Sequence, residues 1–287
     1  MSKKLPLVII LGPTASGKTS LAIKLAKKYN GEIICADSRT IYKGMNIGTA
    51  KPTKEERDIV SHWGLDLVEP GEYFSVSDFK DYAVSKIEEI RARNKVPFLV
   101  GGSGLYLDSI IFDFQFGAKK DLELREKLHQ NSVQELKEYC LKNNIELPEN
   151  GKNKRYIIRS IENNGITTEK IKTPIDNCII VGITTDKNIL MSRITKRTDE
   201  LIQGGVIQEI HNLASIYGWD NEAMTSNIYR AVRDYPDSIE QIKSKNIILD
   251  WQLAKKQMTW FKRNKFIKWY DLDDAEEYIS SCIAHNE

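Results

Sequence analysis

The chain has 287 residues, enough for one large domain or for a core with a smaller inserted piece. Its 42 basic and 40 acidic side chains nearly cancel, so net charge says little about partners. No stretch approaches the roughly 20 apolar residues of a membrane span, which predicts no membrane association. The four cysteines lack the paired spacing of a zinc site or a disulfide framework. With no room for a signal peptide before the first apolar run, we expect a cytoplasmic location.

The first third of the chain alternates between expected strands and helices. Short apolar runs indicate buried strands, and helical segments carry apolar residues on one face. In chain order they are strand 7–11, helix 19–28, strand 32–36, helix 77–93, strand 96–100 and a helix from residue 105. This alternation is typical of a parallel sheet wrapped by helices, whose ligands bind beyond the carboxyl ends of the strands.

The pattern changes near residue 115. Residues 121–172 are helical and charged, without a convincing strand, and a strand signal returns at 178–184 before another helix that ends near residue 204. We therefore expect an inserted helical module at residues 115–172, within a core made of residues 1–114 and 173–287. The C-terminal part is predicted to hold a long helix over 238–263 and a short strand over 266–270.

Residues 12–19 read Gly-Pro-Thr-Ala-Ser-Gly-Lys-Thr, a complete phosphate-binding loop between an expected strand and an expected helix. Glycines let backbone N–H groups converge on phosphate oxygens, and Lys18 adds a positive charge. The hydroxyl of Thr19 can ligate Mg²⁺, and the dipole of the following helix favours an anion. The loop predicts binding of a diphosphate or polyphosphate, as in the many ATP-binding proteins that share it.

Two further segments end expected strands beside this loop. Asp37 can ligate Mg²⁺ through water or accept a proton, although an aspartate there can also cap the next turn. The Gly101–Gly104 turn either forms part of the site or is simply a tight turn. Its strand does not end in the acidic residue that holds Mg²⁺ in motor-type ATPases, which counts against NTP hydrolysis.

Basic side chains suggest where a larger ligand could bind. Arg193 and Arg197 share one helix face, where they could clamp a leaving diphosphate or face solvent. Near the C-terminus, lysines and tryptophans around Lys255 could contact and stack on RNA. The alternative is a solvated helix face with the aromatic residues in the core.

Taken together, five segments resemble the tRNA dimethylallyltransferases, or tRNA isopentenyltransferases, and they occur in that family's order. The lack of a C-terminal zinc-finger pattern favours the bacterial type. The resemblance implies a P-loop NTPase-like α/β fold and transfer of a dimethylallyl group from dimethylallyl diphosphate to tRNA. The acceptor would be the exocyclic amine of the adenosine 3′-adjacent to the anticodon, and diphosphate would be released. The segments are GPTASGKT (12–19), ADSRTIYKGMNIGTAKP (36–52), GGSGLY (101–106), DLELR (121–125) and QLAKKQMTWF (252–261).

The resemblance also implies roles for individual residues. Asp37 would accept the amine proton, Ser103 would lie near the reacting adenine, and Arg197 would face the diphosphate. We expect Mg²⁺ as cofactor, held in part by Thr19, the anticodon stem-loop of tRNA as partner, and a monomer. The diphosphate would contact Gly12, Thr14, Ala15, Ser16, Gly17, Lys18 and Thr19. The tRNA would contact Asp37, Ser38, Arg39, Thr40, Ser103, Arg125, Arg155, Arg159 and Lys255.

The chain departs from the family pattern in RNA-facing segments, while the donor site is intact. Thr40 stands where many members have glutamine, and Asn227–Ile228 lacks the usual glycine. Trp251 replaces an arginine and Tyr156 a basic residue. Two other activities fit parts of the sequence: a small-molecule P-loop kinase using Asp37 on a hydroxyl, and prenylation of free adenine nucleotides. A non-catalytic RNA-binding protein is a third reading, against which the intact phosphate loop counts.

Overall fold

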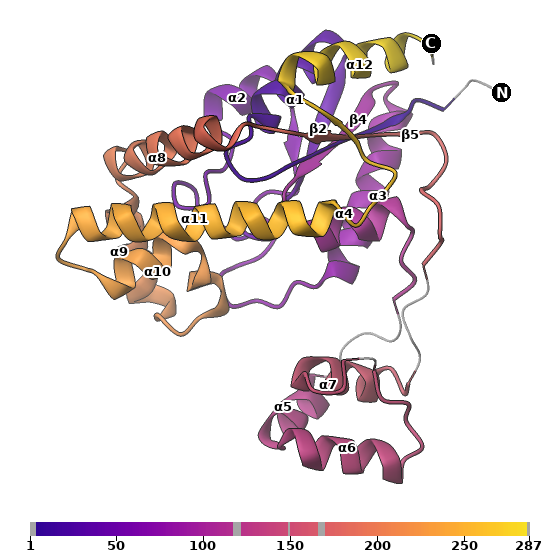
Figure 1. The fold of residues 1–287 in the computed structure, drawn as a ribbon, viewed down its shortest axis with the longest axis vertical. Helices are drawn as coiled ribbons and strands as arrows, with labels where there is room; N and C mark the ends of the chain where they lie inside the picture. Colours follow the sequence, from indigo (N-terminus) through magenta and orange to yellow (C-terminus); the bar gives the residue numbers. More distant parts are fainter. Residues whose placement is uncertain (1–3, 117–121, 149, 166–169, 286–287) are drawn as a thin grey trace. The chain divides into compact units, whose positions relative to one another are not determined.

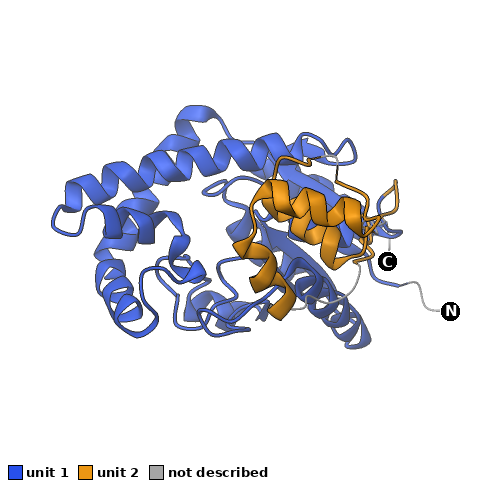
Figure 2. Cartoon of the chain, turned by 90° about the horizontal axis from the view of Figure 1, so that it is seen from below, with its two compact units in different colours: residues 1–111, 174–287 blue, residues 112–173 orange. Residues whose placement is uncertain are grey.

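The protein is described from a computed structural model covering residues 4–116, 122–148, 150–165 and 170–285. The chain divides into two compact units, Met1–Ile111 with Pro174–Glu287 and Phe112–Thr173, which Figure 2 colours separately. The sequence predicts the boundaries of the insertion at residues 115 and 172. Asp121, at the start of the DLELR segment, lies outside the described residues.

In the described part of the first unit, six strands form one parallel sheet in the order β3-β2-β4-β1-β5-β6 (Figure 1). The expected α/β fold with a parallel sheet is therefore confirmed. Four of the strands match predicted ones closely, and β6 is shorter than predicted. The bounds are β1 Leu7–Leu11, β2 Gly31–Ala36, β3 His62–Trp63, β4 Val96–Gly101, β5 Cys178–Ile183 and β6 Lys268–Tyr270.

Helices cover both faces of this sheet. Helices α1 and α12 pack on one face and α3 and α4 on the other, while α8 to α11 form a helical layer around the ends of the strands (Figure 1). Capping boxes at Thr53 and Ser75 fix the starts of α2 and α3. The bounds are α1 Lys18–Lys28, α2 Lys54–Ile59, α3 Val76–Ala92, α4 Gly104–Ile111, α8 Lys187–Gln203, α9 Val206–Tyr217, η1 Glu222–Thr225, α10 Asn227–Asp234, α11 Ile239–Phe261 and α12 Leu272–Ala284.

Helix α12 is not among the elements predicted from the sequence, although its start is well marked. Asp271 caps it by accepting from the backbone N–H of Asp274, and Ala275, Ile279 and Ile283 are buried against the sheet. The spacing of these apolar residues, four apart, is the ordinary helical signal. The helix completes the face that α1 only partly covers.

The second unit consists of α5 Leu122–Gln130, α6 Val133–Lys142 and α7 Lys154–Glu162, with no strand among its described residues. Its small core belongs to this unit alone and contains Leu128, Leu136, Cys140, Ile157, Ile158 and Ile161. Among the residues described in the whole chain, no helix is long and apolar enough to cross a membrane.

The carboxyl ends of three central strands lie level with one another. Gly101 at the end of β4 pairs with Leu11 of β1 on one side and with Ala36 of β2 on the other. The phosphate loop and Asp37 begin at the residue after β1 and β2, and the glycine turn begins at Gly101 itself. Parallel register therefore brings these three segments, which are well separated in the sequence, to one edge of the sheet.

Candidate active site

The phosphate loop connects β1 to α1 in a strained conformation. Ala15 has φ 61° and Gly17 has φ 90°, and at Gly17 an added Cβ would lie 2.9 Å from Leu272 of α12. Glycine is the residue that adopts such an angle without a steric cost. The hydroxyl of Ser16 is buried and has no hydrogen-bond partner, so it is available to a ligand in the loop.

Both arginines of α8 reach the loop. Arg193 Nη1 donates to the carbonyl of Ser16 at 3.0 Å, and Arg197 Nη1 donates to Thr14 Oγ1 at 2.9 Å. The Nε of Arg197 is buried without a partner. An unpaired, buried guanidinium N–H beside a phosphate loop can be satisfied by an anion, which favours the clamp over the solvated alternative.

A glutamine on α11 joins the phosphate loop to the glycine turn. Gln257 Oε1 accepts from the backbone N–H of Thr14 at 2.8 Å, and its Nε2 donates to the carbonyl of Gly102 at 3.1 Å. An added Cβ at Gly102 would approach Gln257 Nε2 to 2.4 Å, so only glycine leaves room for this contact. Sequence reasoning places Gln257 in a family segment but assigns it no role, because its partners lie 243 and 155 residues away.

Asp37 lies in a turn organised by its neighbours. Its Oδ1 accepts from the backbone N–H of Arg39 at 2.9 Å, and its carbonyl accepts from Thr40 Oγ1 at 3.2 Å. Ser103 Oγ accepts from the backbone N–H of Ser38 at 3.0 Å, and Ser103 N–H donates to the carbonyl of Ala36 at 3.2 Å. Asp37 therefore caps its turn, as one of the two sequence interpretations predicts, and its carboxylate also lines the cavity described next.

Most of these residues line one cavity of about 390 Å³ in the first unit. Polar groups from the phosphate loop, the Asp37 turn and α8 line it together with an apolar set from α1 and the strands. A cavity of this size suits a small ligand bearing both a charged and an apolar part. The polar set includes Thr14, Lys18, Thr19, Asp37, Ser38, Arg39, Thr40, Ser103 and Arg197, and the apolar set includes Ala22, Ile33, Cys35 and Val100.

The surroundings of Lys18 destabilise its protonated, charged form. Its Nζ donates to the carbonyl of Pro13 at 3.1 Å. Burial, reinforced by the nearby positive charge of Arg197, lowers the pKa of Lys18 to about 8, while Asp37 raises it. A bound anion would restore the missing charge balance. Burial also raises the pKa of the Cys35 thiol to about 12, so this cavity-lining cysteine is neutral.

Glu209 of α9 holds the loop that follows Asp37. Its Oε2 accepts from the backbone N–H groups of Asn46 and Ile47 at 2.9 and 2.8 Å. Its Oε1 accepts from Gly48 N–H at 2.9 Å and from the hydroxyl of Tyr229 at 3.0 Å. A carboxylate satisfied by consecutive backbone amides is an anion nest, here occupied by the protein's own side chain.

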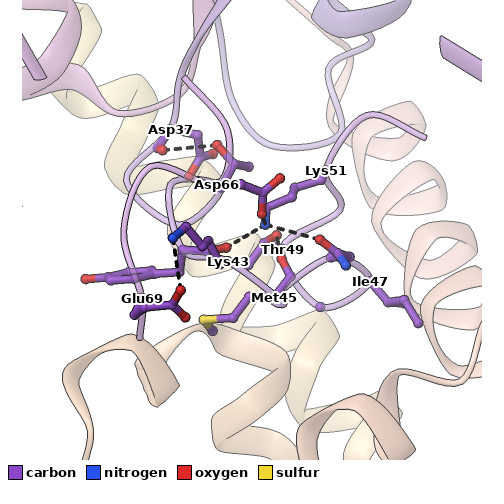
Figure 3. A network of polar contacts seen from close by, with 12 residues as sticks. Asp37, Lys43, Met45, Ile47, Thr49, Lys51, Asp66 and Glu69 are labelled. Atoms are coloured by element: carbon purple, nitrogen blue, oxygen red, sulfur yellow. Dashed lines mark hydrogen bonds and ion pairs between the residues drawn. The ribbon is translucent and has the colours of Figure 1, made fainter. Parts of the chain in front are cut away.

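A buried lysine fixes the other side of that loop, as Figure 3 shows. Lys51 Nζ donates to Asp66 Oδ1 at 2.6 Å, to Asn46 Oδ1 at 3.2 Å and to the carbonyl of Tyr42. Burial lowers the pKa of Lys51, and the hydrogen bond to Asp66 opposes this shift. Together with Glu209, this network fixes the segment that lines the cavity next to Asp37.

The basic residues predicted to contact tRNA lie in different settings. In the second unit, Arg125 makes a two-pronged ion pair with Glu162 at 2.6 and 2.7 Å, and Arg159 contacts the same carboxylate at 3.4 Å. Arg155 is exposed, and so is Lys255 on α11 in the first unit. Arg125 and Arg159 therefore support the fold of the second unit, whereas Arg155 and Lys255 present their charge to solvent.

The departures from the family pattern have structural counterparts. Thr40 is buried and bonded in the Asp37 turn, and Tyr156 is exposed. Ile228 is buried in α10, where an added Cβ on Gly48 would approach it to 3.2 Å. Trp251 packs against the same small cluster of α8 and α11 residues as Ala15 of the phosphate loop. The ammonium groups of Lys187 and Lys255 lie 6.0 and 5.7 Å from its ring centre.

The cavity offers a few oxygen ligands for Mg²⁺ but not a complete set of protein ligands. The described residues contain no group of three or more His, Cys, Asp and Glu side chains able to hold a metal. The hydroxyl of Thr19 and the carboxylate of Asp37 line the same cavity. One or two protein oxygens completed by substrate phosphates and water is the usual Mg²⁺ arrangement, so the residues fit.

Comparison with known proteins gives a consistent picture. The family model described as IPP transferase matches residues 40–264. The chain is 37% identical to the tRNA dimethylallyltransferase of Acetivibrio thermocellus, over 97% of this chain and 96% of that protein. It is 34% identical to the tRNA dimethylallyltransferase of Bacillus velezensis, over 99% and 98%.

Comparison with solved structures points to the same family as the sequence relatives. The full-length tRNA isopentenylpyrophosphate transferase of Bacillus halodurans superposes with a TM-score of 0.75 at 33% identity, covering 99% of this chain and 98% of that one. A eukaryotic dimethylallyltransferase acting on tRNA has a TM-score of 0.77 at 22% identity, over 93% and 73%, and supports the fold alone.

Proposed function

The chain belongs to the tRNA dimethylallyltransferase (IPP transferase) family, and on that premise we propose how its cavity carries out prenyl transfer. The enzyme transfers a dimethylallyl group from dimethylallyl diphosphate to the exocyclic amine of the adenosine 3′-adjacent to the anticodon in tRNA, and releases diphosphate. The observation that carries the proposal is the composition of the cavity, which joins a phosphate loop, an apolar wall and a carboxylate.

The donor's two ends match two parts of this cavity. The phosphate loop, Lys18 and Arg197 bind the diphosphate, which becomes more negative as the carbon–oxygen bond breaks. Donors already aimed at that charge lower the barrier without reorganising. The apolar wall, which includes Ile33, Cys35 and Val100, suits the hydrocarbon tail. Bound Mg²⁺, held in part by Thr19, supplies further neutralisation of the leaving group.

Asp37 acts on the acceptor. Its turn is fixed by Arg39 and Ser103, so the carboxylate is oriented before the substrate arrives. An amine that attacks carbon must lose a proton, and Asp37 is the carboxylate beside the phosphate loop that can take it. The adenosine must leave its stack to bring the amine into the cavity, and the Ser38–Thr40 segment lines its path.

The second unit, residues 112–173, provides a separate RNA-binding surface in this proposal. Its exposed Arg155 is available for phosphate contact, and Arg125 and Arg159 maintain its fold through Glu162. Lys255 contributes a further charge from the first unit. We also propose that the protein acts in the cytoplasm and as a monomer.

An acceptor competition tests the proposal. Purified protein receives labelled dimethylallyl diphosphate and Mg²⁺, with either tRNA or adenosine monophosphate. Label is expected in tRNA at a much higher kcat/KM than in the nucleotide. Preferential labelling of the nucleotide would favour prenylation of free nucleotides, and ATP-dependent phosphorylation of a small molecule without prenyl transfer would favour the kinase.

A further inference from the structure

We propose that Asp250 and Asn246 form a subsite that accepts a hydrogen bond from the ribose 2′-hydroxyl of the acceptor adenosine. The inference rests on the proposed function and adds to it a recognition element for the sugar. Both side chains belong to α11 and line the same cavity as Asp37. None of the roles given above to the phosphate loop, Asp37 or Gln257 uses them.

The position of the pair follows from the helix. Asn246, Asp250 and Gln257 are spaced so that they lie on one face of α11, toward the cavity. Asp250 comes seven residues before Gln257, which contacts the phosphate loop, so it lies about 10 Å away along the helix axis. That separation is comparable to the length of a purine nucleoside.

The hydrogen bonding of the pair is incomplete. Asn246 is only 1% exposed, and its Nδ2 donates to Thr198 Oγ1 at 2.9 Å, yet its Oδ1 is buried without a partner. Asp250 is 9% exposed, and its Oδ1 accepts from Asn227 Nδ2 at 2.7 Å. Its Oδ2 receives only the long contact from Asn246 at 3.4 Å. A carboxylate has about four acceptor positions, so Asp250 retains unused ones.

Within the described residues, none of the ion pairs involves Asp250. The hydroxyl of Ser226, which also lines the cavity, is buried without a partner. A buried acceptor left unpaired costs free energy, so the site favours a ligand that donates a hydrogen bond and disfavours a phosphate.

The acceptor adenosine offers few groups of that kind. Its adenine ring carries one donor group, the exocyclic amine, which is the reacting group and belongs at Asp37. Within an RNA chain the 3′ oxygen is esterified, which leaves the 2′-hydroxyl as the remaining donor of the nucleotide. The 2′-hydroxyl is also the group by which proteins distinguish RNA from DNA. The chemistry therefore assigns the Asp250–Asn246 subsite to the ribose.

The test uses two anticodon stem-loop RNAs that differ only in the 2′ substituent of the target adenosine. One has an ordinary ribose at the target adenosine, and the other has a 2′-fluoro group, which keeps the sugar's size but cannot donate. With labelled dimethylallyl diphosphate, the full-length wild-type protein should prefer the ribose RNA by about tenfold or more in kcat/KM, as expected for a hydrogen bond to a charged acceptor. Asp250→Asn should reduce that preference to threefold or less, and Glu240→Gln, an exposed charge on the same helix, should leave it unchanged.

The preference is a ratio within one variant, so poor folding lowers both rates and leaves it intact. A wild-type protein that prenylates both RNAs equally would overturn the subsite while leaving the proposed function standing. A full preference retained by Asp250→Asn would place recognition of the hydroxyl elsewhere and would also overturn it. Failure of the wild-type protein to prenylate either RNA would instead refute the proposed function, and the subsite with it.

Discussion

Glu209 offers the sharpest test of how the loop after Asp37 is held in place. The carboxylate accepts four hydrogen bonds, three from consecutive backbone amides and one from the hydroxyl of Tyr229, whose side chain is fully buried. Replacing Glu209 with alanine leaves these donors without an acceptor. Asn46 lies where water can replace the lost bond, whereas Ile47, Gly48 and Tyr229 are less accessible.

The magnitude follows from those three less accessible donors. Hydrogen bonds to a charged acceptor are each worth about 1.5–3 kcal/mol, and water partly replaces them, so Glu209→Ala should lower the free energy of unfolding of the first unit by about 3–6 kcal/mol, equivalent to two of the three bonds. Glu209→Gln keeps one acceptor oxygen but turns an N–H group toward two donors, and should lose about half as much. Tyr229→Phe removes a single one of these bonds and should lose about 1.5–3 kcal/mol.

Urea unfolding of the four proteins measures these differences, with Glu240→Gln on the exposed face of α11 as the control for a lost carboxylate. Hydrogen exchange at Asn46, Ile47 and Gly48 reports on the loop directly, and should accelerate in Glu209→Ala. Prenyl transfer should fall as well, because Gly48 lines the cavity. A loss below about 1 kcal/mol in Glu209→Ala with unchanged exchange would refute the reasoning.

Three further predictions concern the cavity and the second unit. Gln257→Leu removes the hydrogen-bonded link between Thr14 and Gly102. Steady-state kinetics should show a kcat about tenfold or more below that of the wild-type protein, with the melting temperature little changed. A kcat equal to that of the wild-type protein would contradict this prediction. Because the pKa of Lys18 is lowered to about 8, its charge is lost as pH rises through 8, so KM for dimethylallyl diphosphate should increase above that pH, whereas Lys18→Arg should show a flat profile. Arg125→Ala leaves the buried carboxylate of Glu162 with only Arg159, at 3.4 Å, as its ion-pair partner, and should destabilise the second unit by about 3–5 kcal/mol. Hydrogen exchange should then become faster in α5 and α7 but not in the sheet. Unchanged exchange would show that the ion pair is dispensable.

Local patterns in the sequence are enough to predict most of the sheet. The apolar runs of β1, β2, β4 and β5 are continuous because those strands are buried on both faces, and such runs are easily recognised. Strand β3 has two residues and no pattern of its own, and it exists only because β2 offers a free edge. Its residues carry too little signal for any periodicity to detect.

The candidate site likewise contains residues that local sequence patterns predict and residues that they do not. Lys18, Asp37 and Ser103 follow strands whose carboxyl ends meet, so the strand pattern alone is enough to group them. The bonds that Gln257 and Glu209 make to the loops of the site cross 155 to 243 residues and depend on how α11 and α9 pack, which no local pattern encodes. Arg125 shows the converse, since a motif suggests an RNA contact and the structure reveals an ion pair with Glu162.

Mass spectrometry of tRNA after incubation with dimethylallyl diphosphate and Mg²⁺ tests the central claim most directly, with wild-type protein and Asp37→Asn side by side. The wild-type protein should add one C₅H₈ unit to the adenosine next to the anticodon. Asp37→Asn should do so about 100-fold or more slowly, as for loss of a general base, while KM for the donor changes little. An unmodified tRNA with the wild-type protein, or an Asp37→Asn variant as fast as wild type, would contradict the account.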